Sequence, residues 1–332
     1  MMTWVDELCR SLVPFILTYI KPFIITFLSS GAIGGIAEGY VLSKKYNHNL
    51  KTAKIVTARP MVKIENNVEK VEQESVPQFE DVPPESLLFD EETKKSIVEN
   101  QLSDTIKEFV TTLEEKNNNL NLFFMYDNLR SLKVNRDIDF ITKFLKGWNG
   151  VYLTGTNEIK LSENSKITFF HELFHMATAF KRYGVDYCGF AQYGGENNLI
   201  GTGINEGYTN LLVEHYFGLK PKSYKYEMRI ARQIENIIGR EKMEQLYFKA
   251  DLQGLIGELS KYCSLDESLN LVQTVDYINY VNSHHRWGML PVKKAYLDKS
   301  IALADGIISD MTSTKNQAEN QYNQKISQTP CI

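Results

Sequence analysis

The sequence predicts an α+β fold that is mainly α: one domain with a small sheet and a helical C-terminal lobe, preceded by one transmembrane helix. Three observations lead to this prediction. Apolar residues repeat at helical spacing through most of the chain after residue 90. Two short strand-like runs flank the turn at residues 155–157. An apolar run at residues 23–42 is about long enough to cross a hydrocarbon core.

The N-terminal segment, residues 1–45, contains this run, whose only charge is Glu38. A secretory signal peptide would begin with a basic cluster and have a shorter apolar region, whereas Asp6 and Glu7 precede this run. We therefore expect a retained, single-pass transmembrane helix at about 23–42, so the chain would be a membrane protein.

Three glycines, Gly31, Gly35 and Gly39, recur every four residues within the expected membrane helix. Small residues at this spacing let two helices approach closely, so they offer a contact for a homodimer. A glycine-rich membrane helix without such a contact is the alternative, and the sequence favours it over a specific dimer.

Basic residues lie mainly on the C-terminal side of the expected helix. Arg10 and Lys21 precede it, and five basic residues follow it: Lys44, Lys45, Lys51, Lys54 and Arg59. The more basic flank usually stays in the cytoplasm, so we expect the large C-terminal part there. The four cysteines form no C-x-x-C pair and are compatible with a reducing compartment.

Two segments are predicted to lack a packed core. Residues 46–92 are acidic and proline-containing with few aromatic residues, which predicts a disordered linker. Residues 314–332 are polar and predict a flexible C-terminal tail. Residues 93–313 between them form the expected globular domain.

The first half of this domain mixes helices and strands. Periodicity and turn residues predict a helix at Thr93–Lys116, a strand at Asn121–Tyr126, a short helix at Ile138–Leu145 and a hairpin of Val151–Thr154 with Glu158–Leu161. A helical run at Lys166–Tyr183 and a glycine- and tyrosine-rich loop at Gly184–Gly203 come next.

The second half is predicted to be helical. The expected helices run from Glu206 to about Phe217, then over Ser223–Ile238, Glu241–Ala250, Leu252–Tyr262, Leu265–Val281 and Leu290–Ile308. These helices would form the C-terminal lobe.

The most informative motif is His171-Glu172-Leu173-Phe174-His175, an H-E-x-x-H pattern inside a helical run. Residues four apart lie on one helix face, so both histidines can bind one metal ion. Glu172 can reach a water beside that metal and act as a base. The flanking residues are apolar, and a buried pair of histidines needs a partner, which a metal supplies.

A third protein ligand is expected from a second helix. Glu206 is the best candidate, because it opens a helical run in the sequence Asn205-Glu206-Gly207-Tyr208. Glu214 and His215 on the same helix and Glu196 in the preceding loop are alternatives.

The H-E-x-x-H motif followed by the N-E-G-aromatic stretch resembles the gluzincin group of zinc peptidases, which includes thermolysin and membrane aminopeptidases. The resemblance covers about fifty residues, from His171 to Phe217, with a longer spacing between the motifs. It implies a zincin-like metallopeptidase domain. In this domain, zinc (Zn²⁺) is the cofactor, the ligands are His171, His175 and Glu206, Glu172 is the general base, and a peptide or protein is the substrate.

The resemblance also suggests supporting residues. Asn210 takes the place of an acidic residue that orients a ligand histidine. Tyr193, Tyr208 or Tyr187 could donate a hydrogen bond to the tetrahedral intermediate, although a tyrosine packed in the core is the more common case.

The resemblance also implies roles for two further groups of residues. Zincin-like peptidases carry a small sheet before the metal helix, so residues 159–161 could be its edge strand and pair with an extended substrate. His284-His285 could act beside the oxyanion, but a turn with exposed histidines is favoured.

The net charge of the chain bears on one function class, nucleic-acid binding. The net charge of −4 gives no electrostatic reason to expect nucleic-acid binding. The resemblance to gluzincins, together with the apolar run at 23–42, implies a membrane-anchored zinc metallopeptidase, a hydrolase. A catalytically inactive scaffold or receptor of the same fold, and a zinc hydrolase of a non-peptide bond, are the alternatives.

Overall fold

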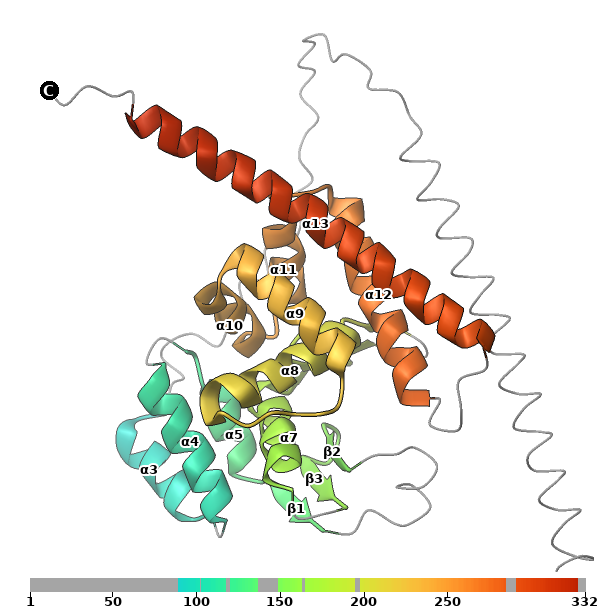
Figure 1. Cartoon of the computed structure of the whole chain (residues 1–332). Coiled ribbons are helices and arrows are strands. Elements are labelled where there is room, and N and C mark those ends of the chain that lie inside the picture. The colour runs from blue at the N-terminus through green and yellow to red at the C-terminus, as the bar shows by residue number, and fades with distance from the viewer. Residues whose placement is uncertain are drawn as a thin grey trace, which may run out of the picture. The chain divides into compact units, whose positions relative to one another are not determined.

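The computed structural model describes residues 89–101, 103–117, 120–136, 149–162, 165–194, 198–284 and 291–327 (Figure 1). The predicted membrane helix at 23–42, nearly all of the predicted linker and the predicted helix at 138–145 lie outside these residues. In the part of the chain that the structure describes, no helix is long and apolar enough to cross a membrane.

The described elements form a mainly helical α+β fold with two small sheets, which confirms the predicted class. The helices are α3 (Glu91–Glu99), α4 (Asp104–Lys116), α5 (Phe123–Leu129), α7 (Lys166–Thr178), α8 (Thr202–Phe217), α9 (Lys225–Ile238), α10 (Arg240–Phe248), α11 (Leu252–Leu259), α12 (Leu265–His284) and α13 (Pro291–Ser327).

The first helices differ from the prediction in two ways. The expected single helix at 93–116 is divided into α3 and α4, and the Asp90 side chain caps α3 by accepting from the Thr93 N–H at 2.7 Å. The expected strand at 121–126 is wrong, because α5 occupies this position. Its aromatic residues favour strands, but Met125, Tyr126 and Leu129 are buried at helical spacing, and this packing decides the structure.

The first sheet holds strands β1 (Lys133–Asn135), β2 (Gly150–Leu153) and β3 (Glu158–Leu161). The predicted hairpin is confirmed: β2 and β3 are antiparallel. However, β3 lies in the centre of the order β1-β3-β2, since β1 pairs with its other side in parallel. The expectation that residues 159–161 form the edge is therefore wrong, and β2 is the edge strand on the side of α7.

A second sheet occupies most of the segment predicted as a loop at 184–203. Strands β4 (Phe180–Arg182), β5 (Val185–Cys188), β6 (Ala191–Gly194) and β7 (Asn198–Ile200) follow one another as an antiparallel meander. The tight turns depend on backbone with positive φ at Tyr183, Gly184 and Gly189. Strands of three or four residues are too short to show a clear alternation of apolar residues in the sequence.

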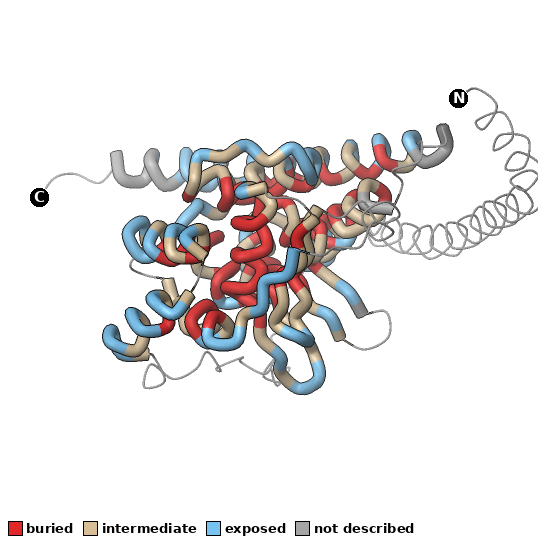
Figure 2. Tube along the Cα trace, turned by 90° about the horizontal axis from the view of Figure 1, so that it is seen from below, coloured by how far each residue is buried: buried red, intermediate tan, exposed pale blue. Residues whose placement is uncertain are grey.

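Helices α7 and α8 lie at the centre of the described elements and form much of the core (Figure 1). The buried residues gather in the middle of the fold (Figure 2). Every residue of α7 from Phe169 to Thr178 is buried. Helix α8 contacts α9 and α12, and α13 packs across α12 and α9 (Figure 1). A helix that is apolar all round belongs in the interior, so the motif helix is held on all sides.

The C-terminal helix extends further than predicted. Residues 314–327, expected as part of a flexible tail, continue α13 to Ser327. This stretch contains no glycine or proline, so nothing in it breaks the helix. The Lys315 ammonium also donates to the backbone oxygen of Asn236 at 3.0 Å, which ties the helix to the end of α9.

Candidate metal centre

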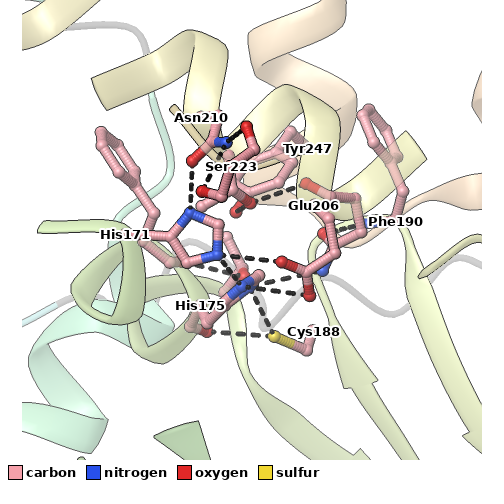
Figure 3. A network of polar contacts seen from close by, with 12 residues as sticks. His171, His175, Cys188, Phe190, Glu206, Asn210, Ser223 and Tyr247 are labelled. Atoms are coloured by element: carbon pink, nitrogen blue, oxygen red, sulfur yellow. Dashed lines mark hydrogen bonds and ion pairs between the residues drawn. The ribbon is translucent and has the colours of Figure 1, made fainter. Parts of the chain in front are cut away.

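Helix α7 presents two histidines to the same point. Ser165 caps its N-terminus by accepting from the Thr168 N–H at 3.3 Å. His171 and His175 are one turn apart, with ring centroids separated by 4.6 Å. Their Nε2 atoms lie 3.0 Å apart, so both nitrogens point at one location (Figure 3).

Helix α8 supplies the third group, and its N-terminus is anchored on α12. The carboxylate of Asp276 accepts from the N–H groups of Gly201 and Gly203 at 2.8 Å each. A Cβ atom at Gly203 would lie 2.2 Å from the backbone oxygen of Val275, so only glycine permits this contact. The anchor sets the position of Glu206 in the next turn of the helix.

Glu206 completes a cluster of three metal-binding groups. Its Oε2 lies 2.9 Å from Nε2 of His171, and its Oε1 lies 3.6 Å from Nε2 of His175 (Figure 3). The ligand atoms of all three residues lie within 4.8 Å of one another. A tetrahedral zinc site with bonds of about 2.0 Å has ligand atoms about 3.3 Å apart, so the spacing fits this metal.

The electrostatics of the cluster favour an ionised carboxylate. Burial alone would raise the pKa of Glu206, but His175 and His171 beside it hold this pKa well below its usual range. An ionised carboxylate with two imidazole nitrogens is a donor set that zinc accepts. The residues therefore fit the predicted cofactor.

Asn210 lies against the first histidine, at the place where the resemblance suggested a supporting residue. Its Oδ1 lies 2.8 Å from Nδ1 of His171, while its Nδ2 donates to the backbone oxygen of Ser223 at 2.9 Å (Figure 3). The bond to Ser223 fixes the amide orientation, so Oδ1 faces Nδ1 of His171 as a hydrogen-bond acceptor. This acceptor supports the neutral ring with its hydrogen on Nδ1, the form in which Nε2 can bind a metal.

Glu172 lies beside the cluster and against β2. It is buried, and burial raises its pKa, with Glu206 adding to this effect and both histidines opposing it. A Cβ atom at Gly150 would lie 2.9 Å from Oε1 of Glu172, so the strand approaches this carboxylate closely. A carboxylate whose proton affinity is raised is suited to accept a proton near neutral pH.

A cavity of about 520 Å³ opens over these residues. One wall is β2 with the turn to β3, so the site is bordered by a strand edge with which no other strand of the described residues pairs. The other lining residues come from α7, the second sheet, α8 and the start of α9; they are His171, Glu172, His175, Cys188, Tyr193, Glu206 and Tyr224.

Of the three tyrosines suggested by the sequence, the structure brings only Tyr193 to the cavity. Tyr208 is fully buried between Phe190 and Tyr247 instead. Tyr187 faces the opposite side of the second sheet, where its ring stacks on Phe180.

Sequence reasoning missed Tyr224. Its ring stacks on that of His171 with the centroids 5.8 Å apart, and it lines the same cavity as Glu206. The charge of Glu206 and burial raise the pKa of this phenol well above its usual value. Its backbone has a φ of 51°, a conformation that costs energy for a tyrosine and is often found at functional sites.

The glycine of the N-E-G motif explains how Tyr224 reaches the site. A Cβ atom at Gly207 would lie 2.3 Å from the backbone of Glu227, so α8 and the first turn of α9 touch there. No local pattern around Tyr224 signals this role, because it depends on a contact between two helices. A glycine directly after a ligand was the only available clue.

The alternative ligands do not join the cluster. Glu214 pairs with Arg232 at 3.0 Å. His215 lies 3.6 Å from Glu235, and burial together with Arg240 lowers its pKa to about 4. Glu196 and His285 lie outside the described residues, and His284 ends α12.

Comparisons of the chain with protein-family models, with curated proteins and with solved structures found no match.

Proposed function

We propose that this protein is a zinc-dependent peptidase, anchored in a membrane by a helix at about residues 23–42, with its catalytic domain in the cytoplasm. The observation that carries the peptidase proposal is the convergence of His171, His175 and Glu206, with Glu172 buried beside them. The anchor and its orientation rest on the sequence alone.

Zinc held by His171, His175 and Glu206 would supply Lewis-acid chemistry, by polarising a scissile carbonyl and making water more acidic. The ligands come from two helices packed in the core, so their positions are fixed before any metal binds. Three protein ligands leave a fourth position for substrate, which distinguishes a catalytic site from a structural one.

Glu172 is the proposed general base. It would accept a proton from the attacking water and pass it to the amine that leaves. Its raised pKa supports the first step, because a stronger base takes the proton of the water more readily.

Tyr224 is the proposed donor to the developing oxyanion. The charge of Glu206 and burial raise its pKa and keep the phenol protonated, and the residue lines the cavity with its ring stacked on His171. A donor held in place before the reaction is worth about 3 kcal/mol of transition-state stabilisation in comparable oxyanion sites.

Strand β2 is the proposed binding edge for the peptide. It pairs with β3 on one side, and its residues line the cavity. Among the described residues no other strand pairs with it, so its remaining backbone groups can bind an extended chain. This arrangement favours peptide substrates over small non-peptide esters or amides.

The proposal is tested by digesting a peptide library with the full chain, with and without a zinc chelator. We expect peptide fragments from the wild type, none after chelation, and recovery when zinc is added back. Glu172→Gln should bind zinc without cleaving, since an amide cannot accept the proton. Cleavage by this variant at the wild-type rate would contradict the proposal.

A further inference from the structure

The two ligand histidines have different neighbours at their second ring nitrogen. Nδ1 of His171 faces one acceptor, Oδ1 of Asn210. Nδ1 of His175 instead lies 3.5 Å from Sγ of Cys188 (Figure 3). It also lies 3.3 Å from Nδ2 of Asn205. The tautomer of the His175 ring therefore depends on which of these two groups can accept a hydrogen bond from Nδ1.

Asn205 cannot accept from His175. Its Oδ1 already accepts from the backbone N–H of Phe190 at 3.0 Å. Phe190 is fully buried, so this N–H needs an acceptor inside the protein. The amide therefore turns its NH₂ group to His175, and an NH₂ group only donates.

Cys188 has the opposite capacity. Its thiol donates to the backbone oxygen of His175 at 3.4 Å, which leaves the lone pairs of sulfur available to the ring. The residue is 3% exposed and lies on β5, on the face of the second sheet that lines the cavity. Among the described residues, Sγ is the only acceptor at Nδ1 of His175.

We propose that Cys188 is a positioning residue for the metal ligand His175. A metal on Nε2 requires the proton of the neutral ring to sit on Nδ1, and that proton then needs an acceptor. Sγ of Cys188 is this acceptor. The NH₂ group of Asn205 can instead donate to Nδ1 in the other tautomer, in which Nδ1 carries no hydrogen. The inference rests on the proposed zinc site and adds that a thiol sets the orientation and tautomer of one ligand.

Cys188 is not a metal ligand in this account. Sγ lies on the Nδ1 side of the His175 ring, whereas His171 and Glu206 meet the ring at Nε2. The cluster of possible ligand atoms contains His171, His175 and Glu206 without Cys188. Sulfur is a weaker hydrogen-bond acceptor than a carboxylate. A stronger acceptor at Nδ1 of His175 should therefore raise the affinity for zinc.

The test measures the zinc dissociation constant of the full chain in detergent, by competition with a chromophoric chelator. Cys188→Ala should weaken binding roughly tenfold to a hundredfold, the usual effect of losing such a partner. Cys188→Ser should stay within about threefold of the wild type, because a hydroxyl also accepts. Cys263→Ala, at a half-buried cysteine in the turn between α11 and α12, is the control and should change nothing.

A second variant distinguishes the loss of the hydrogen-bond acceptor in Cys188→Ala from a disturbance of packing. Asn205→Asp retains the acceptor for Phe190 and places a carboxylate oxygen where the amide nitrogen lies, 3.3 Å from Nδ1. Added to Cys188→Ala, it should restore zinc affinity at least in part. Equal loss in Cys188→Ala and Cys188→Ser, with no recovery in the double variant, would overturn the proposal.

Cobalt(II) substitution separates a positioning role from a ligand role. We expect no sulfur-to-cobalt charge-transfer band in the wild type and altered visible bands in Cys188→Ala. A charge-transfer band that disappears in Cys188→Ser would make Cys188 a ligand and overturn the inference. A wild type that binds no zinc would refute the proposed function as well, whereas an active wild type with unchanged affinity in Cys188→Ala refutes only this inference.

Discussion

Gly150 of β2 lies directly against Glu172 of α7, the proposed base. A Cβ atom at Gly150 would stand 2.9 Å from Oε1 of Glu172 and 2.5 Å from Cγ2 of Thr168. The edge strand and the carboxylate therefore share one narrow contact, and a side chain larger than hydrogen at position 150 has to push them apart.

Gly150→Ala should lower the rate of peptide hydrolysis roughly a hundredfold, the cost of displacing a catalytic group by about 1 Å. Zinc content should not change, because none of the three ligands contacts Gly150. Gly257→Ala on α11 is the control, since a Cβ atom there meets nothing within 4 Å and the residue does not line the cavity. Equal activity of the two variants would show that the contact does not position Glu172.

Asn210→Ala should weaken zinc binding roughly tenfold to a hundredfold, because Nδ1 of His171 loses its acceptor. The measurement is a zinc titration of the full chain against a competing chelator. Asn320→Ala, on the exposed surface of α13, should bind as the wild type does. An unchanged dissociation constant in Asn210→Ala would remove this residue from the site.

Glu206→Gln should weaken zinc binding by more than the Asn210 variant does, roughly more than a hundredfold, because it replaces a ligand itself. Glu214→Gln on the same helix should leave zinc binding intact, since Glu214 pairs with Arg232 on the partly exposed side. Both variants are compared by metal analysis after dialysis. The opposite pattern would mean that Glu214 is the third ligand.

Asp276 should make the free energy of unfolding depend on pH. Burial raises its pKa from 3.8 to about 6, against the hydrogen bonds from Gly203, Gly201 and Thr202. Between these values the folded chain holds the proton more tightly than the unfolded chain, so this residue's contribution to stability falls as pH rises through the window. The loss is at most about 3 kcal/mol.

The check is urea unfolding of the metal-free full chain at pH 4 and pH 6.5, with Asp276→Asn as the comparison. The variant cannot ionise at this position, so its stability relative to the wild type should improve from pH 4 to pH 6.5. It also lacks one acceptor for α8, which lowers its stability by a similar amount at both pH values. A difference that does not vary with pH would contradict the raised pKa.

Much of the candidate site could be predicted from local sequence patterns. The two histidines are one helical turn apart, so their meeting depends only on the helix around them. Glu206 could be chosen over Glu214 and His215 because the N-E-G stretch marked it. The hairpin of β2 and β3 could also be predicted, because its turn and its strands are adjacent in the chain.

Other parts depended on contacts between distant segments, which a single sequence does not display. Tyr224 reaches the cavity because Gly207 lets α9 approach α8. Cys188 lies beside His175 because the second sheet folds back on α7. The strand expected at 121–126 became α5, since burial of its apolar residues at helical spacing outweighed their preference for strands.

The central claim is that His171, His175 and Glu206 bind zinc, and the most direct measurement is the zinc content of the purified full chain. We expect about one zinc per chain in the wild type, because three protein ligands complete a catalytic site with one open position. His171→Ala and His175→Ala should each lose stoichiometric zinc. A wild type without zinc, or either variant with full zinc content, would contradict the account.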